Sequence, residues 1–293
     1  MVLAQVDELD PFHLFIWDPI WFEGTAFEIN RVVLLMFLAS AVCIGFFWLG
    51  SRRGSLVPKG IQNIAESAYF FVRDQIAIDV IGPKDGLRFA PYLATLFFFI
   101  FFMNLLEIVP GINFPVTSRM AIPAMLALLT YIIFNAVGIA RQGGIRYFKD
   151  TLFPPGVPLV VKPLLAIIEL ASVFIFRPLT LAIRLFANMM AGHVLLTIFF
   201  LFTHGFIFVD FNVFTLPIGI LTGVVAAGLI VFEMLVISIQ AYIFTMLTAF
   251  YIAESIHGHG EHDEEHAHEV SGAHADPAKP AGPHVTEGMA EVA

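Results

Sequence analysis

Charged residues are scarce in this 293-residue chain. Asp, Glu, Lys and Arg make up 13% of it, about half the share found in a typical soluble domain. Hydrophobic residues make up 58%, and the mean hydropathy is +0.85. Such a composition excludes an ordinary soluble domain and indicates a membrane protein that crosses the lipid bilayer several times.

Cysteine, basic charge and nucleotide-binding motifs are also lacking. The single cysteine, Cys43, lies inside an apolar run, which excludes a disulfide framework or a thiolate metal site within one chain. The net charge of −9 argues against a nucleic-acid partner. No G-x-x-x-x-G-K-S/T phosphate loop occurs, so we expect no nucleotide site, no cofactor and no catalysis by this chain alone. The acidic start of the chain has no basic region followed by a short apolar core, so we expect no cleavable signal or transit peptide.

Long uncharged runs are abundant, and their lengths predict the fold. The runs 32–49, 90–106 and 120–140 are each long enough for one transmembrane helix. Two further apolar segments, 159–204 and 216–256, would each form a helix about 60 Å long, twice the thickness of the bilayer core. They must therefore tilt steeply or break. We predict an all-α polytopic membrane protein of about five transmembrane helices, in which the last two pair as a hairpin over 159–256.

The Lys and Arg residues of the connections predict the orientation. Six lie in 51–89 and four in 141–162, whereas the opposite side has only Arg31 and Arg119. The positive-inside rule then places the N-terminus outside and, after five crossings, the C-terminus in the cytoplasm.

Three regions follow from this topology. We predict an external N-terminal segment over 1–31, a membrane domain over 32–256 and a disordered, His-rich cytoplasmic tail over 257–293. The tail holds seven of the ten histidines, but no closed ligand spacing, so we expect no specific metal site. Residues 58–81 mix apolar and polar side chains and predict an amphipathic helix on the cytoplasmic surface or between the spans, with an ordinary loop with helical content as the alternative.

Polar residues at membrane depth are the candidates for function. On a helix, Arg184 and Asn188 share a face, while His193 points to the opposite side. Glu233 and Gln240 are seven residues apart and also share a face. A hairpin of the two long helices would place His193 near Glu233, and Gln240 near Arg184.

The chemistry of these side chains favours proton movement. Arg184 stays protonated and is therefore a fixed positive charge. Glu233 and His193 can both titrate, and titratable groups inside a membrane commonly mark a proton path. A purely structural Arg184–Glu233 ion pair is the alternative.

Other polar residues have open interpretations. Arg177 either extends to the cytoplasmic interface or takes another role, and Glu169 either pairs with a basic residue or lines a cytoplasmic vestibule. We expect Glu107 and His204 to be interfacial.

Two stretches carry a family resemblance. The segments RPLTLAIRLFANMMAGH and FEMLVISIQAYIFTMLTAFYIAE resemble the membrane-embedded subunit a of F-type ATP synthases. The resemblance assigns the family's essential arginine to Arg184 and its asparagine and glutamine to Asn188 and Gln240. His193 and Glu233 occupy the two positions that carry a Glu/His pair.

The resemblance also implies a mechanism and partners. A ring of c subunits would turn against the hairpin, and protons would enter through an outer half-channel and leave through a cytoplasmic one lined by Glu169. Arg184 would separate the two half-channels. Peripheral-stalk b-type subunits, the lipid bilayer and protons would be the other partners, in a bacterial plasma membrane. The alternatives are a self-contained ion channel or secondary transporter, for which we find no repeated halves, and a structural assembly factor.

Overall fold

The structure, a computed structural model, describes residues 29–52, 58–152, 161–209 and 212–257. Almost all of the predicted 1–31 segment, and the tail beyond residue 257, lie outside the described residues. Helices dominate the described part, and five of them are long and apolar enough to cross a membrane. The predicted all-α polytopic fold is therefore confirmed.

The elements follow one another along the chain without a sheet among the described residues. The α-helices are α2 (Arg31–Ser51), α3 (Ile61–Val72), α4 (Asp79–Ile81), α5 (Pro83–Leu105), α6 (Ala121–Gln142), α7 (Gly144–Leu152), α8 (Lys162–Ala171), α9 (Arg177–His204) and α10 (Leu216–His257). Three π-turns and a 3-10 turn complete the order: η1 (Arg73–Ile78), η2 (Val116–Ser118), η3 (Ser172–Phe176) and η4 (Gly205–Val209).

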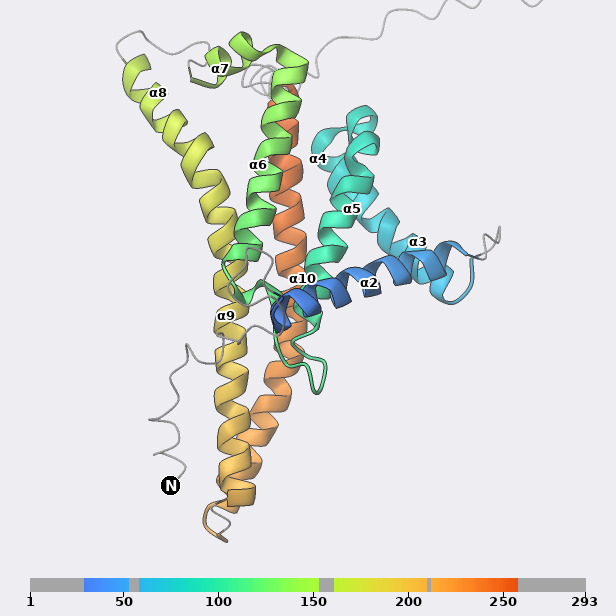
Figure 1. The fold of residues 1–293 in the computed structure, drawn as a ribbon, viewed down its shortest axis with the longest axis vertical. Coiled ribbons are helices and arrows are strands. Elements are labelled where there is room, and N and C mark those ends of the chain that lie inside the picture. The colour runs from blue at the N-terminus through green and yellow to red at the C-terminus, as the bar shows by residue number, and fades with distance from the viewer. Residues whose placement is uncertain (1–28, 53–57, 153–160, 210–211, 258–293) are drawn as a thin grey trace, which may run out of the picture.

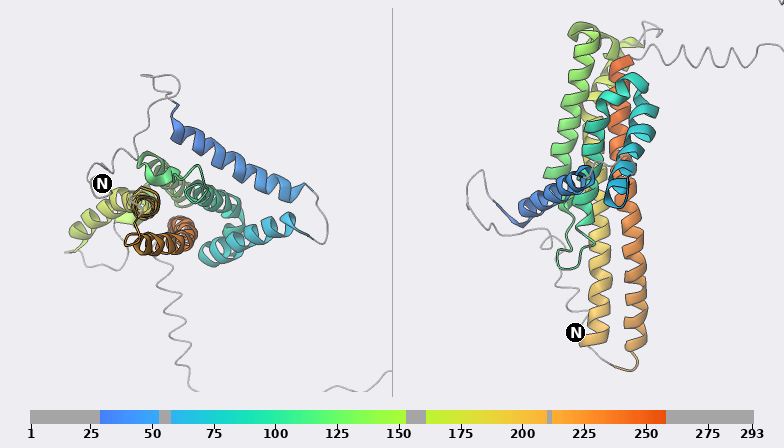
Figure 2. Two further views of the ribbon diagram at one scale, coloured as in Figure 1. Left: turned by 90° about the horizontal axis from the view of Figure 1, so that it is seen from below. Right: turned by 90° about the vertical axis from the view of Figure 1, so that its right-hand side faces the viewer.

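The α9–α10 hairpin is the axis of the molecule. The two helices run antiparallel and side by side over most of their length (Figures 1 and 2). α10 is a single helix of 42 residues, about 63 Å at 1.5 Å per residue. We call the end of the hairpin at the α9–α10 connection the turn end, and the opposite end, where α9 begins and α10 finishes, the open end.

The remaining helices cover one side of the hairpin. α5 and α6 pack against it, and α2 lies across the bundle at a large angle to the hairpin (Figures 1 and 2). The core joins these elements through fully buried side chains such as Ile100 on α5, Leu185 on α9 and Phe244 on α10. The hairpin itself stays largely uncovered, because only 11% and 17% of its most apolar windows are buried.

The predicted amphipathic segment 58–81 is helical from Ile61 onward. It forms α3, η1 and α4, which fold back onto α5 and bury Val72, Ile76 and Ala77 completely. Gly86 permits the close approach, since a Cβ there would collide with the backbone of Ala77. The helix predicted for this segment is therefore present from Ile61 onward, and it packs against α5.

The chain after α5 returns into the bundle instead of remaining at a surface. Phe114 and Val116 are buried, and the Thr117 hydroxyl donates to the side-chain oxygen of Asn104. Arg31 at the start of α2 donates to the Ile112 carbonyl at 2.8 Å. This return lies against α9 and places the residues just after α5 deep in the protein.

Candidate functional site

Arg184 lies on the uncovered face of α9. Its side chain is exposed, as are those of Ile183, Ala187, Asn188 and Ala191, which form a stripe along the helix. No ion pair joins Arg184 to Glu233, although the structure describes both residues. The alternative of a structural Arg184–Glu233 pair is therefore wrong. A fixed cation on an apolar helix face with two small alanines beside it is suited to meeting an anion on another helix.

Asn188 and Gln240 join the two helices of the hairpin one turn from Arg184. The Asn188 side-chain amide donates to the Gln240 side-chain carbonyl at 2.6 Å. Gln240 is 1% exposed, and its Nε2 is buried without a hydrogen-bond partner among the described residues. This bond fixes the register between α9 and α10 beside the arginine.

His193 points into the protein, on the side of α9 away from Arg184. It is buried, and its Nδ1 lies 3.5 Å from a carboxylate oxygen of Glu107. The Glu107 side chain is only 1% exposed. The expectation that Glu107 is interfacial is wrong, because the return of the chain after α5 carries this residue into the bundle rather than to its surface.

Glu233 presses against α9 at the glycine next to His193. A Cβ added at Gly192 would collide with the Glu233 carboxyl group, so a glycine is required for this contact. Glu233 is 4% exposed, and its Oε1 has no hydrogen-bond partner among the described residues. Glu107 lies near enough for its charge to act on Glu233. The structure thus places Glu107, His193 and Glu233 in one buried cluster.

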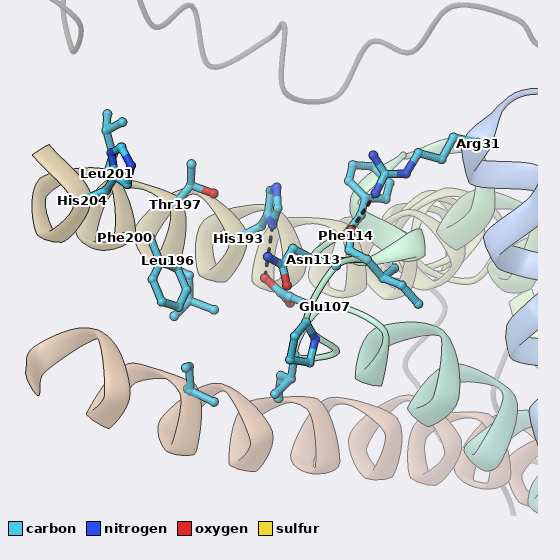
Figure 3. Close-up of a pocket in the computed structure, with 15 residues that line it drawn as sticks. Arg31, Glu107, Asn113, Phe114, His193, Leu196, Thr197, Phe200, Leu201 and His204 are labelled. Atoms are coloured by element: carbon cyan, nitrogen blue, oxygen red, sulfur yellow. Dashed lines mark hydrogen bonds and ion pairs between the residues drawn. The ribbon is translucent and has the colours of Figure 1, made fainter. Parts of the chain in front are cut away.

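A cavity leads from this cluster toward the turn end of the hairpin. It has a volume of about 880 Å³, and Figure 3 shows Glu107 and His193 at one part of it and His204 farther along α9. Thr197 lies between the two histidines on the same helix. Apart from the His193 ring nitrogen at 3.5 Å, the buried carboxylate oxygens of Glu107 have no hydrogen-bond partner among the described residues, so water or a proton would stabilise them there. The cavity therefore brings a few polar side chains together among largely apolar walls.

The open end of the hairpin holds a different arrangement. Arg177 donates to both oxygens of Glu254 at 2.5 and 2.7 Å, and its guanidinium lies over the Tyr251 ring at 5.2 Å. Arg177 therefore does not simply extend to an interface. Glu169 is half-buried and lies near enough for its charge to act on Arg177.

The small residues of α10 divide into two groups. Gly219 lies against η4 at Ile207, and Gly223 lies against α9 at Thr203, so both allow the close approach near the turn end. Ala227 and Gly228 are exposed, and nothing lies within 4 Å of a Cβ built at Gly228. These two belong to the uncovered face of the hairpin.

Sequence reasoning missed three functional candidates: Glu107, Gly192 and Glu254. The charge of Glu107 at the end of an apolar run was the only local signal, and it does not show that the chain turns inward there. Glu254 pairs with a residue 77 positions away. In the part of the chain that the structure describes, no three His, Cys, Asp or Glu side chains are arranged so that they could hold a metal ion together.

Comparisons with known proteins agree with this architecture. The model of the family described as ATP synthase A chain matches residues 33–253. ATP synthase subunit a of Parafrankia sp. (strain EAN1pec) is 45% identical over 262 residues, which cover 86% of this chain and 87% of that protein. The subunit a of Rhodococcus erythropolis is 43% identical over 79% of this chain and 84% of its own length. That of Rhodospirillum rubrum is 38% identical over 80% and 92%.

These matches span most of the chain and come from bacterial proteins, and the five apolar helices make it a multi-pass membrane protein. A self-contained channel or transporter finds no support among them. The chain belongs to the ATP synthase A chain family, as a membrane subunit of the F0 sector of an F-type ATP synthase.

Proposed function

We propose that this subunit is the proton-conducting stator of the rotary complex. It provides two half-channels to a ring of c subunits, and Arg184 stands between them. The chain itself is not catalytic, and ATP chemistry takes place on other subunits. The observation that carries the proposal is the division of α9, with an exposed cation on one face and a buried titratable cluster on the other.

The outer half-channel follows the cavity at the turn end. Protons enter it near His204 and reach Glu107 and His193, whose side chains are 3.5 Å apart. Glu233, in contact with α9 at Gly192, delivers them toward the uncovered face. The amides of Asn188 and Gln240 organise the last part of the route, because their hydrogen bond spans the two helices.

Arg184 attracts an ionised carboxylate of the rotor and blocks a direct leak between the two routes. A charge pair at 4 Å contributes about 4 kcal/mol at an effective dielectric constant of about 20. One charge that crosses 100 mV contributes about 2.3 kcal/mol. The attraction is therefore strong enough to hold the carboxylate and of the same order as the work that a transmembrane potential does on one charge.

The inner half-channel runs toward the open end of the hairpin. Glu169 is half-buried near Arg177 and is the acceptor for protons that leave the rotor. This assignment places the turn end outside and the open end in the cytoplasm, in agreement with the basic residues of the connections.

The partners follow from the surfaces that remain uncovered. The c-ring carries the rotor carboxylates and lies against the hairpin face of Arg184, where Ala187 and Ala191 permit close approach. Peripheral-stalk b-type subunits hold the membrane domain, residues 32–256, against rotation. The segment 1–31 is external, and the tail 257–293 is cytoplasmic.

The test is ATP-driven proton pumping in inverted membrane vesicles that carry Arg184→Ala. We expect pumping to be abolished while the complex assembles with its c-ring. Arg88→Ala, at an exposed arginine of α5, is the matched control and should leave pumping unchanged. Normal pumping by an assembled Arg184→Ala complex would refute the gating role of Arg184.

A further inference from the structure

A single π-turn interrupts the long helix between Glu169 and Arg177. α8, η3 and α9 form one continuous helical segment, Lys162–Val209. Within it, the Arg177 backbone N–H donates to the Ser172 carbonyl, five residues earlier, instead of to the residue four earlier. Before the turn, the Ser172 N–H donates to Ile168 and Glu169 as in ordinary helices.

Pro178 gives a local reason for this turn. A proline inside an α-helix has no N–H to donate, and its ring collides with the carbonyl four residues earlier, here that of Phe174. Widening the preceding turn by one residue moves that carbonyl away from the ring. Single π-turns inside α-helices are also frequent at functional sites.

The extra residue changes the face on which Glu169 lies. Glu169 precedes Arg177 by eight positions, which in a regular α-helix would separate the two side chains by about 80° around the axis. A π-turn accommodates one extra residue without further rotation around the helix axis. The eight positions therefore rotate the chain as seven would, and the angle between the two side chains falls to about 20°. Arg184 follows Arg177 by seven positions and lies on nearly the same face.

We propose that η3 is a register device that holds Glu169 on the helix face of Arg177 and Arg184. The inference rests on the proposed exit role of Glu169 and adds the element that aims it. Two observations support it. Glu169 is near enough for its charge to act on Arg177, and α8 has no buried residue that would otherwise fix its rotation.

The lack of buried residues on α8 makes a clean experiment possible. An alanine inserted between Leu170 and Ala171 turns Glu169 by about 100° relative to Arg177 and displaces no core side chain. We expect ATP-driven pumping in inverted vesicles to fall to the level of Glu169→Gln. The complex should still purify with its c-ring.

Moving the carboxylate by one position should then restore function. In the chain with the insertion, Glu169→Leu combined with Leu170→Glu returns a carboxylate to the original face, and we expect pumping near that of the parent. The same double substitution without the insertion turns the carboxylate away and should reduce pumping. A general disturbance of folding or assembly would not be repaired by shifting one carboxylate.

The outcomes separate this inference from the proposed function. Unimpaired pumping by Glu169→Gln would refute the exit role of Glu169 and the register role of η3 together. A loss with Glu169→Gln, without restoration in the shifted variant, would refute only the register role. We expect pumping to be lost with the insertion alone and with the double substitution alone, and to be restored when the two are combined.

Discussion

The two ends of the α9–α10 hairpin hold charge in opposite ways. At the turn end, Glu107, His193 and Glu233 are buried, and no Lys or Arg of the described residues forms an ion pair with the carboxylates of Glu107 and Glu233. At the open end, Arg177 is held by both oxygens of Glu254. The turn end therefore suits groups that gain and lose protons, whereas the Arg177–Glu254 pair at the open end keeps its charges fixed.

The difference follows from the cost of burying charge. A buried carboxylate without a cation is stable only when it is protonated or reached by water, so a proton path benefits from such groups. A bidentate arginine–carboxylate pair keeps both charges and fixes their geometry. Arg184 lies between these two regions on the uncovered face, where the proposed function has it meet a carboxylate of another subunit.

Among the changes that test this contrast between the two ends, the largest expected effect is at Gly192. Gly192→Ala places a methyl group in the Glu233 carboxyl, so the carboxylate must move from its position against Gly192. We expect ATP-driven pumping to fall by at least tenfold, which corresponds to about 1.4 kcal/mol in the barrier. Gly45→Ala on α2 is the control, since nothing lies within 4 Å of a Cβ there, and should pump normally. Equal activity of the two variants would show that the Glu233 contact has no role in transport.

Glu107 is the next test of the turn end. Glu107→Gln keeps the size of the side chain but removes its ability to carry a proton, so we expect pumping to fall several-fold. Glu107→Asp retains the carboxyl group and should recover part of the rate. If the glutamine variant pumps normally while the complex is intact, Glu107 only packs against His193 and the outer route bypasses it.

At the open end, breaking the pair should affect stability more than transport. Glu254→Gln leaves Arg177 without its carboxylate, and we expect a loss of about 2 kcal/mol, as for other buried groups deprived of a partner. The double variant Arg177→Gln with Glu254→Gln removes both charges and should be more stable than the single one. The rate of thermal inactivation of the purified complex measures the stability of the single and the double variant. A double variant less stable than either single variant would show that the two positions contribute independently.

Much of the fold could be predicted from the apolar runs alone. Run lengths located five helices, but α5 begins at Pro83, seven residues before the predicted run, because Lys84 and Arg88 extend from an exposed helical turn into solvent. Helical periodicity correctly separated the faces of Arg184 and His193. Both predictions depend only on positions near in sequence.

The features that were missed depend on distant parts of the chain. The burial of Glu107 requires the return over 106–120 to pack against α9, and the Arg177–Glu254 pair joins residues 77 positions apart. The π-turn at η3 had a local signal in Pro178, but a proline inside a helix is compatible with a kink as well as a widened turn. A single sequence does not choose between these outcomes, since neighbouring helices decide which one packs.

The smallest expected effect concerns the second arginine–carboxylate pair, between Arg141 on α6 and Asp85 on α5. The Arg141 side chain is 40% exposed, compared with 17% for Arg177, so water already solvates much of its charge. Exposed ion pairs contribute about 0.5 kcal/mol, and we expect Arg141→Gln to change thermal inactivation only slightly and pumping not at all. Glu254→Gln, measured in parallel, should be clearly less stable. If the two variants lost equal stability, exposure would not explain the strength of these pairs, and the contrast between fixed charges in the hairpin and charges at the surface would fail.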